Sequence, residues 1–535
     1  MTRQVCLLVG ASALLSFLAC GGPQTPEGTI PPMEDAPEVA EAPETEPAPA
    51  KQPPPESGPA NDIAFPPIER AELDNGLELN VVRWDELPVV YLRLVVRSGA
   101  ETDPEELQGL SDLVAQMLKE GTRRRSSAEI AEAVEFLGAD LWTGADEENV
   151  HLVFRALSDQ LDEAMAILAE VATQPAFRQA ELDKLKRREL DRLALMQKRP
   201  NFLARRALYR RMYGEGHPYA RVDTTEEALG RVGRRDLQRW HRRHFVPSNA
   251  FLVAVGDVTA EQIQSSAAEH FGRWRGREVQ ARELPEPPRR ERREVVVVDR
   301  PGAVQSVILL GNLAIARDDE DFVPLRVANQ VLGGSAASRL FMDLRERRSL
   351  TYGAYSQVGE RVGVAPFVAY ASVRTEVTEE AVGAFFENLD RIVAEAPPEP
   401  ELANAQRFLS DSFPLKIDTP GKIASLVADL RVFGLPDDYW DGYRTSIREV
   451  SAEEALAAAQ EHIRPEQMLV LVVGNAASFA ESLTQWGPVT VVDGEGEVQQ
   501  TFEAGSASGQ AEGTAEGEGG GASAEATEAT NADGT

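Results

Sequence analysis

The sequence predicts an α+β fold with two homologous domains, each made of helices packed on a largely antiparallel sheet. Three observations lead to this prediction. The chain has 535 residues, which is too many for one ordinary domain. A segment of helix, proline turn and buried strand occurs twice. Strands and helices do not alternate strictly, and no glycine-rich phosphate loop stands between a strand and a helix, which argues against a nucleotide-binding parallel sheet.

The repeat is clearest around two prolines. Pro247 recurs as Pro465 and Gly256 recurs as Gly474, in both cases 218 positions later and with no insertion between them. In each copy a helix precedes the proline, and an apolar strand runs from the turn to the glycine. Self-similarity over this length indicates two copies of one domain rather than an array of short repeats.

The expected elements follow from hydrophobic periodicity. Each copy opens with apolar strands, at 79–83 and 89–96 in the first copy and at 295–298 and 304–310 in the second. Helical periodicity follows in the first copy at 127–137, 157–173 and 180–196.

Composition sets the domain limits. The segments before and after the two copies are rich in Pro, Glu and Ala or in Gly, Ala and Glu, and such segments cannot bury a core. We therefore predict a signal peptide at 1–20, a disordered tether at 21–65, an N-terminal domain at 66–280, a linker at 281–294, a C-terminal domain at 295–495 and a disordered acidic tail at 496–535.

The N-terminus predicts a lipid anchor. Arg3 precedes a short apolar stretch, and the small residue before Cys20 resembles a bacterial lipobox. This predicts cleavage before Cys20 and acylation of its thiol, so the membrane would be held through an acyl anchor only. We expect a place in the cell envelope, on the periplasmic side of a Gram-negative host. The outer membrane is favoured over the inner because Gly21 is not an aspartate retention signal. A plain signal peptide with an incidental cysteine stays open.

Charge and cysteine content exclude several classes of function. Lys and Arg number 55 against 87 Asp and Glu, a formal net charge of −32, which argues against binding nucleic acid. The only cysteines are Cys6 and Cys20. The two copies therefore hold no disulfide framework, no thiolate nucleophile and no thiolate metal site.

A family resemblance begins at residues 97–122, which resemble the zinc-helix segment of the insulinase/pitrilysin metallopeptidases. Other stretches are similar in order and spacing: 138–141 with Glu147 and Glu148, 217–219, 247–257, Gln305 with 332–334, and 338–352. The resemblance covers 66–495. Members of this family pair two such domains, which implies that the chain forms half of a clam-shell-like chamber. Gly333 and Gly334 are either a mobile substrate loop or a turn, and we favour the turn.

The zinc motif itself is degenerate. Active members carry His-x-x-Glu-His, in which the two histidines bind zinc and the glutamate activates the bound water. The matching positions here are Asp112, Ala115 and Gln116. An alanine methyl cannot take a proton, and a glutamine amide is a poor zinc ligand. The family's third ligand, a glutamate, would fall near Arg192 or Leu193, with Glu189 and Asp191 close by.

The histidines support the same interpretation without any alignment. Six occur in the chain, and none forms an H-x-x-E-H or H-E-x-x-H motif. His241 and His244 are the only close pair, and we expect structural roles for them although a metal site is an alternative. We therefore predict that this chain binds no cofactor, and that zinc belongs to a partner subunit.

The second copy keeps two residues of interest. Without the resemblance, the run from Arg345 to Arg348 is a solvated helix end with cations near its C-terminus. The resemblance implies that Arg345 and Tyr352 reach into a zinc site, contact substrate carbonyls and steady the oxyanion. Arg348 would replace Arg345 if the register were shifted.

These observations lead to one main hypothesis and two alternatives. The main hypothesis is a zinc-less, substrate-binding subunit that pairs with a zinc-bearing insulinase-family subunit to hydrolyse peptides, as the mitochondrial processing peptidase divides labour between its chains. Peptide would add to a sheet edge through backbone hydrogen bonds. The first alternative is a non-catalytic peptide-binding or scaffold lipoprotein without a protease partner. The second, an active protease with an unusual metal site, is disfavoured because Ala115 removes the base.

Overall fold

The computed structural model describes residues 63–279 and 284–505. The predicted signal peptide with Cys20, nearly all of the predicted tether and most of the predicted tail lie outside the described residues. Within the described ranges, no helix has both the length and the apolar character needed to cross a membrane.

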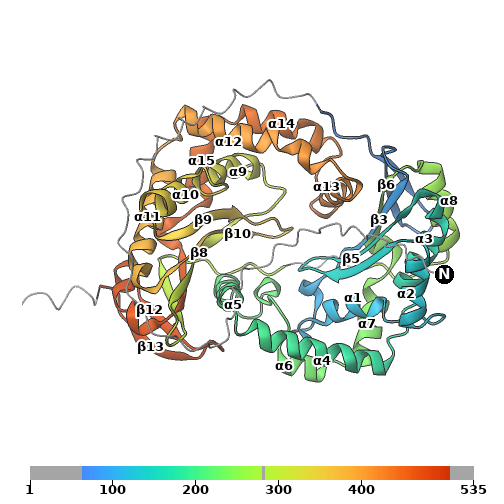
Figure 1. The fold of residues 1–535 in the computed structure, drawn as a ribbon, viewed down its shortest axis with the longest axis horizontal. Coiled ribbons are helices and arrows are strands. Elements are labelled where there is room, and N and C mark those ends of the chain that lie inside the picture. Colours follow the sequence, from blue (N-terminus) through green and yellow to red (C-terminus); the bar gives the residue numbers. More distant parts are fainter. Residues whose placement is uncertain (1–62, 280–283, 506–535) are drawn as a thin grey trace, which may run out of the picture. The chain divides into compact units, whose positions relative to one another are not determined.

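The first sheet has six strands in the order β1-β2-β6-β3-β5-β4, and all neighbours are antiparallel except β2 and β6 (Figure 1). Its strands are β1 (Glu69–Glu72), β2 (Glu78–Arg83), β3 (Val89–Val96), β4 (Asp140–Ala145), β5 (Val150–Leu157) and β6 (Ala250–Gly256). The predicted strands at 79–83 and 89–96 are thus present as β2 and β3. Strand β6 is buried along its whole length, as expected of a central strand without polar alternation.

The second sheet has seven strands in the order β13-β12-β7-β11-β8-β10-β9. Its strands are β7 (Glu294–Asp299), β8 (Gln305–Ile315), β9 (Thr351–Val358), β10 (Ala365–Arg374), β11 (Leu469–Gly474), β12 (Val489–Val492) and β13 (Val498–Phe502). Only the β7 pairings with β11 and β12 are parallel. The α+β class is confirmed. The predicted start of the tail at 496 is wrong, because β13 pairs in antiparallel register with β12 and so continues the sheet.

Helices cover both sheets. The first half contains α1 (Leu110–Leu118), α2 (Ser127–Phe136), α3 (Leu161–Thr173), α4 (Gln179–Met196), α5 (Pro200–Tyr213), α6 (Glu226–Arg231), α7 (Arg234–His244) and α8 (Ala260–Phe271). The second half contains α9 (Phe322–Leu332), α10 (Arg339–Phe341), α11 (Thr378–Ala394), α12 (Glu399–Asp411), α13 (Pro420–Val432), α14 (Tyr439–Glu449) and α15 (Ala452–His462). The repeat is exact in this respect: α7 and α15 begin and end 218 positions apart.

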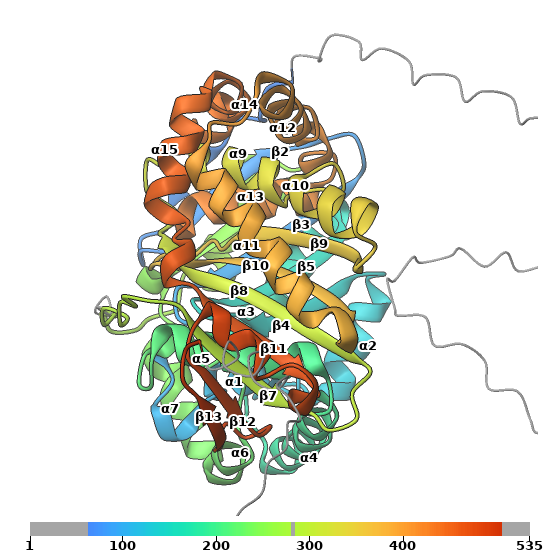
Figure 2. The same cartoon turned by 90° about the vertical axis from the view of Figure 1, so that its left-hand side faces the viewer.

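The two halves exchange a helix. Helix α5 packs on β8 and β11 of the second sheet, and α13 packs on β3 and β6 of the first. Figure 1 shows α13 above the first sheet, and Figure 2 shows α5 beside β11. Prolines start both helices, Pro200 and Pro420, because proline suits the first turn. Each half therefore completes its core with the other's helix, although the predicted domain limits at 280 and 295 stay a prediction.

Candidate functional site

Helix α1 carries the degenerate motif, and its position is fixed by a polar cap and an apolar face. Asp103 accepts hydrogen bonds from the backbone N–H of Gly109 at 3.0 Å and of Ser111 at 2.9 Å, which satisfies donors at the helix start. Gly109 has φ +88 and lies against Thr224, so a side chain there would be strained. The apolar residues of α1 are buried in the first core. This leaves Asp112 and Gln116 one turn apart on the opposite face.

The side-chain amide of Gln116 joins two carboxylates. Its Nε2 donates to Asp112 Oδ2 at 2.8 Å and to Glu189 Oε1 of α4 at 3.3 Å. Ala115 has no exposed surface and contributes only a methyl group to the core. Of the two carboxylates named beside the expected third position, Glu189 is the one that contacts the degenerate motif, through Gln116. The placement of the third ligand near Arg192 or Leu193 stays a prediction.

Arg192 supplies the positive charge of this cluster. Its Nε donates to Glu189 Oε2 at 2.6 Å, and its two terminal nitrogens donate to the carboxylate of Asp223 at 2.8 and 3.3 Å. The hydrogen bond to Asp223 and the pair with Glu189 raise the pKa of Arg192 above its ordinary value. Burial raises the pKa of Asp112, although the Gln116 hydrogen bond opposes this shift. A cavity of about 250 Å³ opens beside Asp112 and Glu189.

The residues around α1 do not fit a catalytic zinc ion. Such a site needs three protein ligands with free lone pairs and a base that activates water. Here the amide of Gln116 faces the carboxylates with its N–H groups, and Ala115 offers no base. A zinc ion would also have to displace the guanidinium of Arg192 from Glu189.

Arg345 lies on an irregular helical segment in the second half. Residues Met342–Arg347 form a π-helix that continues α10, and Arg348 N–H donates to Asp343 C=O at 3.0 Å across five residues. Single π turns of this kind often occur at functional sites. The guanidinium of Arg345 lies 4.8 Å from the ring centre of Phe341, and its one ion pair among the described residues is with the adjacent Glu346 at 3.5 Å.

Tyr352 lies on β9, an edge strand of the second sheet, and the residue is 94 % exposed. A β-bulge explains this exposure. Thr351 and Ala354 of β9 pair with Val373 and Ala371 of β10, so β9 holds one extra residue in this interval. A bulge bends the strand and redirects the side chains within it.

The alternative residue Arg348 is tied to neighbouring carboxylates. Its Nε donates to Asp343 Oδ1 at 3.1 Å, and a terminal nitrogen contacts Glu387. Arg345 is therefore the better free donor of the two. Neither Arg345 nor Tyr352 lines the cavity beside Asp112, so the chain itself does not bring the two predicted parts together.

His241 and His244 bind different partners. His241 Nε2 contacts Ala172 C=O at 2.8 Å, and burial lowers the pKa of His241 to about 4. His244 Nδ1 contacts Ser98 Oγ at 2.9 Å. Ser98 Oγ also donates to Arg97 C=O at 2.7 Å and accepts a hydrogen bond from Asn249 Nδ2 at 3.1 Å.

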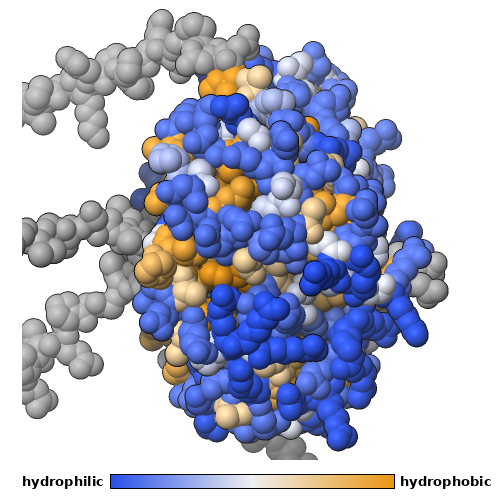
Figure 3. Space-filling model, turned by 90° about the vertical axis from the view of Figure 1, so that its right-hand side faces the viewer, coloured by the Kyte–Doolittle hydropathy of each residue, from blue (hydrophilic) through white to orange (hydrophobic). Residues whose placement is uncertain are grey.

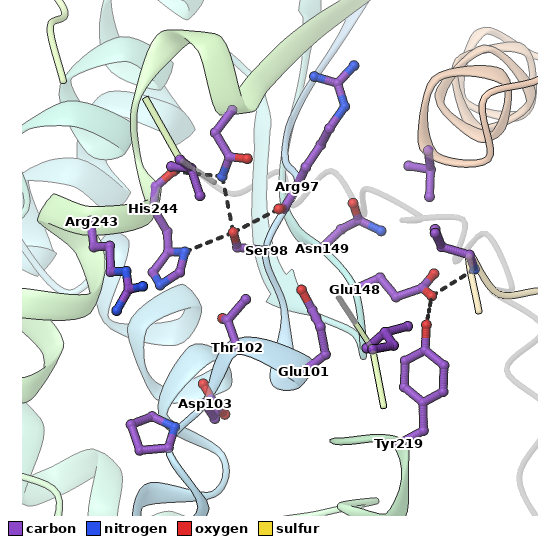
Figure 4. Close-up of a pocket in the computed structure, with 16 residues that line it drawn as sticks. Arg97, Ser98, Glu101, Thr102, Asp103, Glu148, Asn149, Tyr219, Arg243 and His244 are labelled. Carbon is purple, nitrogen blue, oxygen red and sulfur yellow. Dashed lines mark hydrogen bonds between the residues drawn. The ribbon is translucent and has the colours of Figure 1, made fainter. Parts of the chain in front are cut away.

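A second cavity, of about 650 Å³, adjoins these residues and was missed by sequence reasoning (Figure 4). Three carboxyl groups line it. Burial raises the pKa of Glu101 to about 9 and that of Asp103 to about 7, and it also raises the pKa of Glu148. The hydroxyl of Tyr219 donates to Glu148, as Figure 4 shows. Residues 97–122, Glu148 and 217–219 belong to stretches that resemble the family in order and spacing. No pattern in the sequence shows that they meet at one cavity, because three separate segments supply them.

The wall of this cavity also joins the two halves. The loop between β9 and β10 inserts Arg361, which donates to Glu147 Oε1 at 2.9 Å and lies 4.4 Å from the ring centre of Tyr219. The next residue, Val362, donates its N–H to Glu148 Oε1 at 2.8 Å. The β4–β5 and β9–β10 turns are thereby locked to each other.

Family models match both halves of the chain. Residues 83–222 match the model of insulinase, peptidase family M16, and residues 231–409 match the model of the peptidase M16 inactive domain. The chain belongs to peptidase family M16. The first match contains the degenerate helix, and the second, of the inactive type, contains Arg345 and Tyr352.

Individual M16 relatives carry both kinds of name. An uncharacterized zinc protease of Streptomyces coelicolor is 22 % identical over 74 % of this chain and 87 % of its own. The non-peptidase homolog YmxG of Helicobacter pylori is 23 % identical over 73 % of this chain and 90 % of its own.

Solved structures of the family support the fold. The crystal structure of a peptidase M16 inactive domain from Pseudomonas fluorescens has a TM-score of 0.72 and 26 % identity, and the match covers 76 % of this chain and 98 % of that one. A protease from Helicobacter pylori has a TM-score of 0.66 at 17 % identity, with 76 % and 99 % covered. This M16 chain thus has the M16 fold and an inactive-type domain.

Proposed function

We propose that this M16 chain is a zinc-less, substrate-binding subunit that completes the peptidase site of a zinc-bearing M16 partner. The observation that carries the proposal is the α1 cluster, where Gln116 and Arg192 occupy the carboxylates that a zinc ion would need. The fold and the helix are kept while the chemistry of the helix is lost. A chain of this kind holds peptide but does not cleave it alone.

The exposed pair on the second half supports the proposal of a partner. Tyr352 is nearly fully exposed on an edge strand, and in the described part of the chain Arg345 pairs only with the adjacent Glu346, at 3.5 Å. A phenol and a guanidinium are suitable donors for negative charge developing on a substrate carbonyl oxygen. In this proposal Arg345 and Tyr352 act on the oxyanion formed at the partner's zinc.

Peptide binding is proposed to use sheet edges. Strand β4 is an edge of the first sheet and packs against α1, and β9 is an edge of the second. An edge strand has unpaired backbone groups, so an extended peptide can add as a further strand with little sequence preference. The proposed setting is the periplasmic side of the cell envelope, with Cys20 as the site of acylation.

Metal analysis and mixing test the proposal. The purified full chain should hold no stoichiometric zinc and should not cleave peptides. Activity should arise on mixing with an M16 member that carries intact His-x-x-Glu-His and is encoded beside it. One zinc per chain, or chelator-sensitive activity of the chain alone, would overturn the proposal. Binding of peptide with no activity on mixing would favour the peptide-binding lipoprotein instead.

Substitutions separate the donor pair from its surroundings. Arg345→Ala or Tyr352→Phe should lower kcat of the mixed enzyme by about 10²-fold, as loss of an oxyanion donor does. Matched controls are Arg347→Ala on the same π-helix, with a side chain 70 % exposed, and Tyr370→Phe on the neighbouring strand. Both controls should leave kcat within about twofold. If the substitutions of Arg345 and Tyr352 change kcat no more than the control substitutions do, these two residues do not act on the oxyanion.

A further inference from the structure

A groove of about 1130 Å³ lies between α7, the turn after α3 and the segment that follows α8. We call it the arginine groove, because seven arginines line it against one carboxylate, Glu278. Four come from α7 and three from neighbouring segments: Arg234, Arg239, Arg242, Arg243, Arg123, Arg275 and Arg277. Figure 3 views the side of the molecule that carries α8 and α3, where strongly hydrophilic residues dominate the lower half.

Most of these guanidinium groups have no carboxylate partner within the described residues. Arg239 forms an ion pair with Asp236 at 3.6 Å, whereas Arg234 and Arg275 donate to backbone carbonyls. The side chains of Arg242 and Arg243 are exposed and have no ion pair with any described carboxylate. In a chain with a net charge of −32, such a concentration of unneutralised arginine is a local reversal of sign.

The repeat provides an internal control. Helix α15 is the counterpart of α7 at the offset of 218 positions, and it has the same length and leads into the same turn and strand. Where α7 has Arg242 and Arg243, α15 has Gln460 and Glu461. No arginine occurs in α15. The fold therefore requires the helix but not its arginines. The arginines of α7 thus need an explanation other than the stability of the fold.

The floor of the groove is aromatic. The ring of His241 stacks on Phe245 at 4.4 Å and meets the edge of Phe177 at 5.5 Å. Phe177 has φ +46, a strained backbone conformation for a residue other than glycine. Trp274 closes the floor and donates its indole N–H to Phe245 C=O at 3.0 Å. A rigid apolar floor under a rim of guanidinium groups suits a ligand that has both carboxylates and apolar side chains.

The size and charge of the groove select the class of ligand. A free phosphate ion is too small to engage arginines from three segments, and a nucleic acid would be repelled by the remainder of the acidic surface. A concave site also does not match a flat lipid surface. Guanidinium groups bind carboxylates through paired hydrogen bonds. We propose that the arginine groove is a docking site for an acidic, extended peptide segment. This inference is independent of whether the chain has a zinc-bearing partner.

Binding of a labelled peptide to the full chain tests this inference. The probe is a fluorescently labelled peptide of about ten residues in which Glu alternates with Phe and Leu. Its binding to the chain is measured by fluorescence anisotropy. We expect saturable binding that weakens as salt rises from about 0.05 to 0.3 M, because exposed charges are screened. A lysine-rich peptide of the same apolar sequence should not bind.

The groove variant is taken from the counterpart helix. Arg242→Gln with Arg243→Glu gives α7 the residues that α15 carries, and both positions are exposed, so folding should be unaffected. This variant should weaken peptide binding by about tenfold or more. The control is Arg187→Glu with Arg374→Glu, two exposed arginines outside the groove, which should bind as the unsubstituted chain does.

Two results would overturn the proposal. The first is equal peptide binding by the groove variant and the control. The second is absence of peptide binding while anionic vesicles of phosphatidylglycerol, or duplex DNA, bind in a manner that depends on Arg242 and Arg243. Neither result bears on metal content or on peptidase activity, so failure here is distinct from failure of the proposed function.

Discussion

Arg192 and Asp223 form a two-contact ion pair, with both terminal nitrogens of the guanidinium bound to one carboxylate at 2.8 and 3.3 Å. The third nitrogen of Arg192 binds Glu189, whose side chain is only 5 % exposed. One arginine thus pairs with two acidic groups beside the degenerate motif of α1. The positive charge of Arg192 stabilises this cluster. The first prediction therefore concerns the stability of a variant that lacks Arg192.

Arg192→Leu should lower the free energy of unfolding by about 3 kcal/mol, because the buried carboxyl group of Glu189 would lose its ion pair and keep only the hydrogen bond from Gln116. Part of the loss is recovered by water, since Arg192 is partly exposed. Urea unfolding followed by circular dichroism measures the change. Arg188→Ala is the control, because its contact with Gln116 is long, at 3.4 Å, and exposed. Equal stabilities of the two variants would contradict the role assigned to Arg192.

Local signals in the sequence predicted part of this arrangement. The helix with Asp112 and Gln116 on one face follows from 3.6-residue periodicity, and the equivalence of α7 and α15 follows from the offset between Pro247 and Pro465. The partner Glu189 could not be fixed, because residues one turn apart on α4 have the same helical periodicity. The Arg192–Asp223 pair depends on a loop 31 residues away, which has no sequence pattern of its own.

The exchange of α5 and α13 was also beyond the sequence. Periodicity identifies which face of a helix is apolar, but it does not say which sheet that face meets. The apolar residues of α5 are buried among β8 and β11, with Leu208 only 1 % exposed. This long-range contact gives the second prediction.

Leu208→Ala should destabilise the second sheet more than the first. The cavity left by the truncated side chain costs about 2–4 kcal/mol. Amide hydrogen exchange should therefore accelerate in β8 and β11, while β2 and β3 on the other sheet change less. Arg205→Ala, at an exposed position on α5, is the control. Faster exchange confined to the first sheet would contradict the packing of α5.

Glu101 gives a prediction about pH. Burial raises the pKa of Glu101 to about 9, whereas an unfolded glutamate has a pKa of about 4.3. Between these values the folded state holds a proton that the unfolded state has lost. The contribution of Glu101 to stability is therefore complete below about pH 4.3 and is lost as the pH rises through about 9.

Glu101→Gln should flatten this dependence. The amide resembles the protonated carboxyl but does not ionise, so the variant should lose less stability than the original chain between about pH 6 and 9. Urea unfolding at several pH values measures the slope. Glu105→Gln, at an exposed position four residues on, should leave the slope unchanged. If the free energy of unfolding changes with pH equally in Glu101→Gln and in the original chain, the carboxyl group of Glu101 is already ionised at neutral pH.

Arg361 gives the last prediction, because it joins the two halves through one loop. Its side chain is 8 % exposed, pairs with Glu147 and lies over three tyrosine rings, with centroid distances of 5.2, 5.7 and 4.4 Å for Tyr209, Tyr213 and Tyr219. Arg361→Met should cost about 2–3 kcal/mol, since the ion pair and the cation–π contacts are lost together. The free energy of unfolding of Arg361→Lys should lie between those of the original chain and of Arg361→Met. An ammonium group keeps the charge but cannot stack as a planar guanidinium does.

A double-mutant cycle with Glu147→Gln separates the two contributions. Glu147 is 36 % exposed, so its coupling with Arg361 should be about 0.5–1 kcal/mol, and the larger share should come from the tyrosines. Hydrogen exchange in the β9–β10 loop should rise in Arg361→Met, because that loop is anchored to the first half through this side chain and its neighbours. If the coupling energy equals the whole loss of stability in Arg361→Met, the ion pair with Glu147 and not the tyrosines holds the two halves together. If hydrogen exchange in the β9–β10 loop is unchanged in Arg361→Met, Arg361 does not anchor that loop.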